Sequence, residues 1–329
     1  MRRLLVNDAL TQIPGTRTFW NDLEDWFGME FVGGDYATLA EKADEECDPD
    51  EYDGEMISLI IRNATWFPPI PRSKRIPTIS LLQDIFAEGP QREMQEMVIN
   101  SSLAVAFNSE FTKSHYTKDW TDALKEQARA PIIPLPVNFS IFEPQNPMGC
   151  QQALGLPDGC VCWIGACREA GHIKGFDIFL AIVRANPDIP FVGMFKDQQP
   201  DYAPPNLRMF TRLTHQDLVK VIGACRVGLC TSRMESQHLA GIEMGACGLP
   251  LVVPSVGTYW KREHLVGAIV EDPSPDRLSL ALRTVIGNGL PADADFIHSY
   301  WRKEFDREVI KAQWTKLIEE VENASASPM

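Results

Sequence analysis

The stretch Glu235–Glu243, ESQHLAGIE, places two glutamates eight positions apart and runs on into MGACGLP at 244–250 and LVVPS at 251–255. Small and apolar residues recur at helical spacing from Leu239 to Ala246, which predicts a helix. The glycine and proline of the GLP that follows predict the end of this helix. Because LVVP then reads as a strand, the segment indicates a loop, a helix and a buried strand of an α/β domain.

The start of this helix is a candidate phosphate site. Backbone N–H groups near Gln237, His238, Leu239 and Ala240 point out of the expected helix N-terminus, where they can bind phosphate oxygens. Glu235 lies just before this terminus and Glu243 about two turns into the helix, so both can accept hydrogen bonds from sugar or ribose hydroxyls. Taken alone, two glutamates eight apart are more typical of a solvated helix face.

A second candidate element lies upstream. The apolar run Val161–Gly165 predicts a strand, and Gly165 permits a tight turn after it. Arg168 and Lys174 follow in a loop that opens a helix expected over Phe176–Val183. Fixed cations of this kind stabilise the negative charge that develops on a leaving diphosphate, and they do so more in the transition state than in the ground state.

Together the two elements resemble the E-x7-E signature and the strand–Gly–Arg–loop–Lys-Gly element of retaining GT-B glycosyltransferases, specifically those similar to glycosyltransferase family 4. The resemblance implies that Arg168 and Lys174 bind the donor diphosphate, that Glu235 faces the donor sugar and that Glu243 holds the ribose. Gln237 and His238 stand where the family usually has Phe-Gly. The implied fold class is α/β, a GT-B fold of two Rossmann-like domains whose parallel sheets face a central cleft.

The N-terminal half reads as a second α/β unit. A strand over Leu4–Asn7 is followed by a loop that carries Gly15 and Thr16, and then by a helix over Phe19–Phe27. By resemblance, this loop faces the diphosphate and the acceptor, and Thr16 replaces a second glycine. The pattern predicts further strands over Met29–Val32, Met56–Ile61, Thr78–Leu82, Leu103–Phe107 and Pro131–Leu135.

The acceptor side shows a departure from the family. Many relatives carry His-Asp after the strand at 78–82, whereas this chain has Gln83-Asp84. An amide can donate to or accept from a sugar hydroxyl, but it cannot relay a proton. Asp84 is a candidate for binding or deprotonating the acceptor, and capping of a loop is an equal alternative.

The resemblance also suggests domain limits. Residues 1–138 are expected to form the acceptor-side domain, completed by a C-terminal helix over 305–329, and residues 139–304 the nucleotide-sugar domain. The proline-rich PLPVNFSIFEP at 134–144 is similar to the family's linker. Arg212 belongs to the loop expected to approach the nucleotide base.

Composition excludes several functional classes. The 329-residue chain has a net charge of −14, which counts against non-specific binding to nucleic acid or anionic lipid. It has no apolar run near twenty residues and no signal-peptide pattern, so we expect a cytoplasmic protein without a transmembrane span. The eight cysteines form no metal-binding pattern and read as buried thiols. We expect neither a cofactor nor a metal.

These observations predict a glycosyltransferase, a hexosyl- or pentosyltransferase of EC 2.4, that moves a sugar from a nucleotide diphosphate sugar to a hydroxyl acceptor. A UDP-sugar is favoured and a GDP-sugar is next. Retention by a front-face mechanism and independence of metal follow from the resemblance. Open alternatives are a nucleotide-sugar epimerase, a catalytically weak binding module, and transfer to a polymer such as DNA with hydroxylated bases. Oligomeric state is left open.

Overall fold

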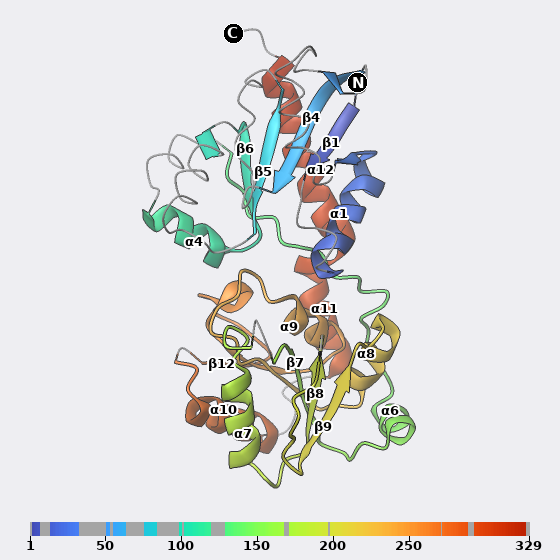
Figure 1. Ribbon diagram of the computed structural model, residues 1–329, viewed down its shortest axis with the longest axis vertical. Coiled ribbons are helices and arrows are strands. Elements are labelled where there is room, and N and C mark those ends of the chain that lie inside the picture. Colours follow the sequence, from blue (N-terminus) through green and yellow to red (C-terminus); the bar gives the residue numbers. More distant parts are fainter. Residues whose placement is uncertain are drawn as a thin grey trace. The chain divides into compact units, whose positions relative to one another are not determined.

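The computed structural model describes residues 2–6, 14–32, 51–52, 55–63, 76–83, 99–100, 102–119, 129–167, 171–196, 198–270, 272–288 and 293–326. The chain forms two compact units. Unit 1 comprises Met1–Pro136 with Ile310–Met329, and unit 2 comprises Val137–Val309 (Figure 1). Each unit is built on its own sheet of predominantly parallel strands.

Unit 1 has a sheet in the order β2-β1-β4-β5-β6, with all neighbours in this order parallel. Its strands are β1 (Arg2–Val6), β2 (Glu30–Val32), β4 (Glu55–Asn63), β5 (Thr78–Leu82) and β6 (Ala104–Phe107), with β3 (Glu51–Tyr52) antiparallel to β4. The described helices are α1 (Pro14–Phe27), α4 (Glu110–Asp119) and the greater part of α12 (Arg307–Ala326). The Phe19 and Trp314 rings lie 5.9 Å apart, so α12 packs on α1 although the two are remote in sequence.

Two sequence-based boundaries in unit 1 are corrected. The helix expected from Phe19 begins at Pro14, so Gly15 and Thr16 lie in the first turn of α1 and not in a loop. Proline is well suited to this position because the first helical N–H groups have no partner within the helix. The strand expected over Pro131–Leu135 is reduced to a single bridge between Ile132 and Phe107.

Unit 2 has a sheet in the order β12-β11-β10-β7-β8-β9, and every pairing is parallel. The strands are β7 (Val161–Gly165), β8 (Phe191–Phe195), β9 (Leu207–Thr211), β10 (Val227–Leu229), β11 (Leu251–Pro254) and β12 (Gly267–Val270). The helical segments are α6 (Pro147–Leu154), α7 (Phe176–Ala185), α8 (His215–Gly223), α9 (Leu239–Ala246), η1 (Gly257–Tyr259), α10 (Pro275–Gly287) and α11 (Ala294–Phe305). Thr214 caps α8, because its hydroxyl accepts from the Asp217 amide.

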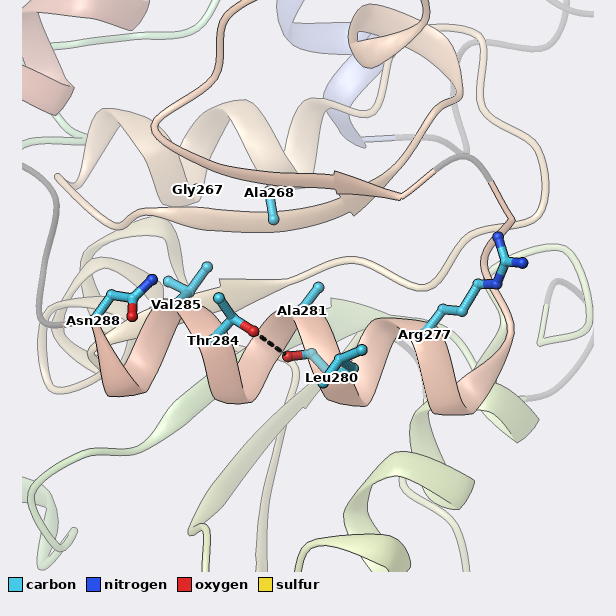
Figure 2. Close-up of a pocket in the computed structure, with 8 residues that line it drawn as sticks. All are labelled: Gly267, Ala268, Arg277, Leu280, Ala281, Thr284, Val285 and Asn288. Carbon is cyan, nitrogen blue, oxygen red and sulfur yellow. Dashed lines mark hydrogen bonds between the residues drawn. The ribbon is translucent and has the colours of Figure 1, made fainter.

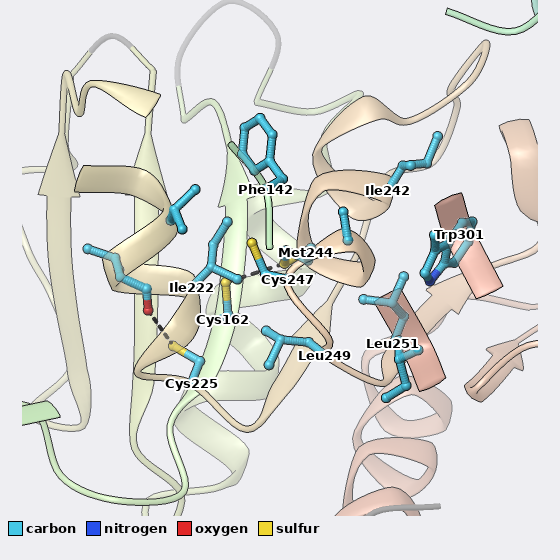
Figure 3. Close-up of a cluster of buried hydrophobic side chains, with 14 of the residues drawn as sticks. Phe142, Cys162, Ile222, Cys225, Ile242, Met244, Cys247, Leu249, Leu251 and Trp301 are labelled. Carbon is cyan, nitrogen blue, oxygen red and sulfur yellow. Dashed lines mark hydrogen bonds between the residues drawn. The ribbon is translucent and has the colours of Figure 1, made fainter. Parts of the chain in front are cut away.

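Alternate residues of the unit 2 strands enter separate cores on the two faces of the sheet. Cys162 of β7 packs with α8, α9 and α11 on one face (Figure 3). Its neighbours Val161 and Trp163 pack with α7 and α10 on the other face. This division follows from the two-residue period of a strand covered by helices on both sides. The seven described cysteines are free and five of them are buried, in keeping with the thiols expected from the sequence.

The GT-B-type α/β class expected from the sequence agrees with these two parallel sheets. Within the described segments, no helix is both long enough and apolar enough to cross a membrane.

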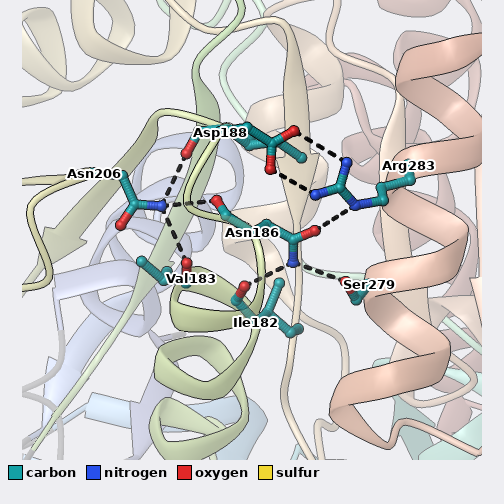
Figure 4. Close-up of polar contacts among 8 residues, drawn as sticks. Ile182, Val183, Asn186, Asp188, Asn206, Ser279 and Arg283 are labelled. Atoms are coloured by element: carbon teal, nitrogen blue, oxygen red, sulfur yellow. Dashed lines mark hydrogen bonds and ion pairs between the residues drawn. The ribbon is translucent and has the colours of Figure 1, made fainter.

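A polar network joins the C-terminal end of α7 to the middle of α10 (Figure 4). The Asn206 amide nitrogen donates to the carbonyls of Val183, Asn186 and Ile189 at 2.9–3.0 Å. The buried Asn186 side chain donates to Ile182 and Ser279 and accepts from the Arg283 guanidinium at 2.6 Å. Turns that would otherwise bury unpaired carbonyl groups are satisfied in this way.

We predict that Asn206→Ala destabilises unit 2 by about 1–3 kcal/mol, because one side chain satisfies three carbonyls there. Urea unfolding should show a lower midpoint with an unchanged denaturant dependence of the free energy of unfolding. Asn288→Ala is the matched control, since that side chain is exposed. Equal midpoints for the two variants would contradict the assigned role of Asn206.

Candidate functional site

The first feature of the site is the ion pair that joins Lys174 to Glu235. The Lys174 ammonium donates to both Glu235 carboxylate oxygens, at 2.7 and 3.0 Å. The Ser232 hydroxyl donates to the same carboxylate at 2.6 Å. Glu235 is only 8% exposed, whereas the Lys174 side chain keeps 35% of its surface accessible. A cation therefore faces solvent over a nearly buried acid.

Strand order brings these two residues together. Lys174 follows β7 and Glu235 follows β10, and the two strands are parallel neighbours. The chain continues from β7 toward β8 on one side, while β10 leads to β11 on the other. The crevice at the carboxyl ends of such a pair, where strand order reverses, is the usual ligand site of an open α/β sheet.

Local packing fixes the Lys174 loop. The Thr231 hydroxyl donates to the Lys174 carbonyl at 3.0 Å and accepts from the indole of the buried Trp163 at 2.8 Å. Gly175 has φ +65°, and a Cβ there would overlap the Thr231 carbonyl oxygen. Gly165 at the end of β7 lies against the Trp163 ring, so a Cβ at this position would overlap the ring. The loop is thus tied to the end of β10.

Burial and charge oppose each other at Glu235. Burial alone would raise its pKa, but the charges of His238 and Lys174, with hydrogen bonds from Lys174 and Ser232, lower the pKa below its usual value. Burial lowers the pKa of His238 to about 4. Because His238 is then neutral near pH 7, the Lys174 ammonium is the charge that keeps Glu235 ionised under those conditions.

The N-terminus of α9 lies next to this acid. His238 caps the helix in a left-handed conformation, with φ 75° and ψ 62°. The first helical N–H groups, those of Leu239 and Ala240, have no acceptor within an α-helix and carry its positive dipole end. Gln237 is buried, and its carbonyl accepts from the Thr258 amide at 3.1 Å. The predicted helix terminus is therefore present beside Lys174 and Glu235.

Glu243 lies one turn into α9, and not two as the sequence suggested. Its side chain is half-buried, and among the described residues its carboxylate has neither a hydrogen bond nor an ion pair. Burial raises the pKa of Glu243 to about 7. An acid held in this way gains from any ligand that donates hydrogen bonds to it.

The remaining predicted residues lie on other elements or outside the described residues. Arg212 is exposed at the end of β9, an edge strand two positions from β7, and has φ 52°. Gly15 and Thr16 belong to α1 of unit 1. Gln83, after β5 of unit 1, is 5% exposed, and its buried side-chain nitrogen has no hydrogen-bond partner among the residues that the structure describes. Arg168 and Asp84 lie outside the described residues.

Two contributors were missed by the sequence analysis. Ser232 could have been suspected, because TS at 231–232 ends the strand just before Glu235. Tyr259, whose hydroxyl lies 3.1 Å from the His238 ring, carries no local signal because it comes from a different loop.

A separate hollow of about 430 Å3 lies between one face of α10 and β12 (Figure 2). It is lined by Gly267, Ala268, Arg277, Leu280, Ala281, Thr284, Val285 and Asn288. None of these is a predicted site residue, and the lining offers one charged group. Across the described ranges, no group of three or more His, Cys, Asp or Glu side chains is arranged to hold a metal ion.

Comparison with known proteins adds to this geometry. No protein-family model matches the chain. It is 27% identical over 247 residues to the D-inositol 3-phosphate glycosyltransferase of Acidothermus cellulolyticus, covering 63% of this chain and 52% of that protein. The enzyme of the same name from Segniliparus rotundus is 24% identical over 226 residues, with 62% and 47% covered. The chain thus spans about half the length of the curated relatives it matches.

Solved structures resemble the whole chain. Sucrose-phosphate synthase from Thermosynechococcus elongatus superimposes with a TM-score of 0.76 at 14% identity, covering 98% of this chain and 100% of that one. Anabaena HepE in complex with UDP also gives 0.76, at 15% identity, with 97% and 100% covered.

The chain therefore has the fold of the GT-B glycosyltransferases. In sequence, it is similar to curated proteins named as glycosyltransferases. The family resemblance expected from the E-x7-E segment is confirmed at this level.

We predict that Glu243→Gln makes the protein more stable at pH 8. The folded-state pKa of Glu243 is raised to about 7, so its contribution to stability is full below the unfolded pKa and is lost as pH rises through 7. Unfolding free energies at pH 5 and pH 8 should differ by about 2 kcal/mol more in the wild type than in the variant.

Glu263→Gln is the control, because Glu263 is an exposed acid of the same unit. The unfolding free energy of this variant should depend on pH as that of the wild type does. An identical pH dependence for Glu243→Gln and the wild type would show that Glu243 ionises normally.

Proposed function

We propose that this protein is a retaining glycosyltransferase that moves a sugar from a nucleotide diphosphate sugar to a hydroxyl group. A UDP-sugar is the favoured donor and a GDP-sugar the next. The observation that carries the proposal is the Lys174–Glu235 pair at the N-terminus of α9, at the carboxyl ends of adjacent parallel strands. The cation and the helix N-terminus can bind the diphosphate, and the acid can accept hydrogen bonds from the sugar.

Each residue has a defined part in the proposal. Lys174 and the Leu239 and Ala240 amides bind the diphosphate and stabilise the charge that grows as the glycosyl–phosphate bond breaks. Glu235, kept ionised by Lys174, accepts hydrogen bonds from sugar hydroxyls. Glu243 accepts from the ribose hydroxyls, which gives its unpaired carboxylate a donor. Arg168 joins Lys174 in the family pattern.

The chemistry needs no covalent intermediate. The acceptor oxygen forms a bond to the anomeric carbon on the face from which the diphosphate leaves. The acceptor proton passes to an oxygen of the leaving phosphate, so charge and atoms balance without a metal. Lys174 has three N–H donors and Glu235 takes two, which leaves one for the phosphate.

A donor panel tests this proposal directly. Thermal unfolding would be followed with UDP-, GDP-, ADP- and TDP-sugars, where a ligand at 100 times its dissociation constant adds about 2.7 kcal/mol. Stabilisation by one base class, with release of the nucleoside diphosphate when acceptors are added, is expected. Stabilisation without release would favour the binding module, and product isomerisation without an acceptor would favour the epimerase.

We predict that Lys174→Met weakens UDP binding by at least about 10-fold, because a charge-assisted contact to phosphate is lost. Titration calorimetry with UDP measures the effect. Lys220→Met is the matched control, since Lys220 is exposed on α8 and pairs with Asp217 of the same helix. Unchanged UDP affinity in Lys174→Met would remove Lys174 from the phosphate site.

Gln83 is the proposed hydroxyl-binding residue of unit 1. Its buried nitrogen is a donor without an acceptor in the described part of the chain, and an unmet donor costs about 1–3 kcal/mol unless a ligand satisfies it. Asp84 adjoins it as the proposed acceptor-binding acid.

We predict that Gln83→Met leaves the ligand-free protein as stable as the wild type, or more stable by about 1 kcal/mol, because methionine matches glutamine in volume and has no amide to bury. Transfer to the acceptor should nevertheless fall. Urea unfolding and initial transfer rates measure the two effects separately. A loss of stability with unchanged transfer would mean that Gln83 is structural.

A further inference from the structure

His238 makes contacts that the diphosphate-binding pattern does not explain. Its ring is 6% exposed, with Nδ1 3.1 Å from the Tyr259 hydroxyl and Nε2 3.8 Å from Glu235 Oε1. The ring thus stands between a fully buried tyrosine and the acid of the proposed sugar site. Nδ1 faces a hydroxyl, which can donate or accept a hydrogen bond, and Nε2 faces a carboxylate, which when ionised can only accept.

The neighbours decide which ring nitrogen carries the proton. The ionised Glu235 carboxylate can only accept hydrogen bonds, so it favours N–H on the nitrogen that faces it, Nε2. Nδ1 is then left as an acceptor for the Tyr259 hydroxyl. An imidazole nitrogen is a good acceptor for a phenol hydroxyl, so the Tyr259 proton points to His238. Since its pKa is lowered to about 4, the ring is neutral at pH 7.

Backbone and packing hold the ring in this place. His238 adopts φ 75°, a left-handed conformation that residues with a Cβ rarely adopt. Gly241 leaves room for the arrangement, because a Cβ there would overlap the Tyr259 hydroxyl and approach the His238 ring. The family pattern has glycine at the position of His238, where this backbone carries no strain. The chain therefore carries an imidazole at a position where the left-handed backbone disfavours a side chain. This indicates that the ring has a function.

We propose that His238 is a positioning residue for Glu235, with its tautomer set by Glu235 and Tyr259 together. Nε2–H faces Glu235 Oε1 at 3.8 Å, an electrostatic contact that adds to the hydrogen bonds by which Ser232 and Lys174 orient the carboxylate. When Lys174 turns toward a bound diphosphate, His238 and Ser232 remain to orient the acid toward the sugar. The inference rests on the proposed function. It gives His238 a role in how Glu235 holds the sugar and no role in binding the nucleotide.

The tautomer is measurable in the ligand-free protein. Long-range 15N–1H correlation spectra report which ring nitrogen is protonated, and His238→Asn assigns the His238 signals. We expect the Nε2–H form in the wild type, loss of the single tautomer in Tyr259→Phe, and no change in Tyr300→Phe. Tyr300 is the matched control because its hydroxyl bonds the His264 carbonyl and Arg262 instead. An Nδ1–H form in the wild type overturns the proposal.

Kinetics separates positioning from binding. His238→Gly removes the ring but permits the left-handed backbone, so the fold should be retained. We expect kcat with the UDP-sugar selected by the donor panel to fall about 10-fold, with the dissociation constant of UDP alone unchanged. An unchanged kcat overturns the proposal, as does an equal loss of UDP binding. If the wild type binds none of the nucleotide sugars, the proposed function fails while the tautomer measurement still decides the role of His238.

Discussion

The parallel pairing of β7 with β10 is the constraint on which the site depends. It sets the end of Val161–Gly165 beside the end of Val227–Leu229, although more than sixty positions separate them in the chain. The Lys174 loop and the Glu235 loop therefore leave the sheet side by side. Helices on both faces cover the strands with apolar side chains, so the sheet cannot shift without losing both cores.

Charge placement at this edge follows one principle. Glu235 is nearly buried and Glu243 half-buried, but among the described residues only Glu235 has a cation and a hydroxyl as partners. Glu243 has burial alone, and its pKa moves in the opposite direction. The two glutamates of one motif therefore differ. Glu235 is ionised and held in place, whereas Glu243 can accept hydrogen bonds from a ligand. Proteins commonly hold such unfavourable groups where a ligand will satisfy them.

Residues with positive φ also shape this edge of the sheet. Gly175 and His238 both start helices with positive φ, and each turns the chain sharply at the carboxyl edge of the sheet. At Gly175 a side chain would strike the backbone of the neighbouring loop. His238 adopts the same conformation although it carries a ring, and Tyr259 and Gly241 lie next to that ring.

The sequence by itself determined the α/β class and the helix that begins near Leu239, since these depend on periodicity and capping along one segment. Its resemblance to a known family named Lys174 and Glu235 as candidate site residues. The sequence pattern misplaced the start of α1 and the strand at 131–135, because helix ends and edge pairing depend on neighbours. Only the tertiary structure decided that Lys174 bonds Glu235, that Arg212 lies at a distant strand, and that Tyr259 reaches His238. Such contacts are set by strand order, and no local pattern records which strands become neighbours.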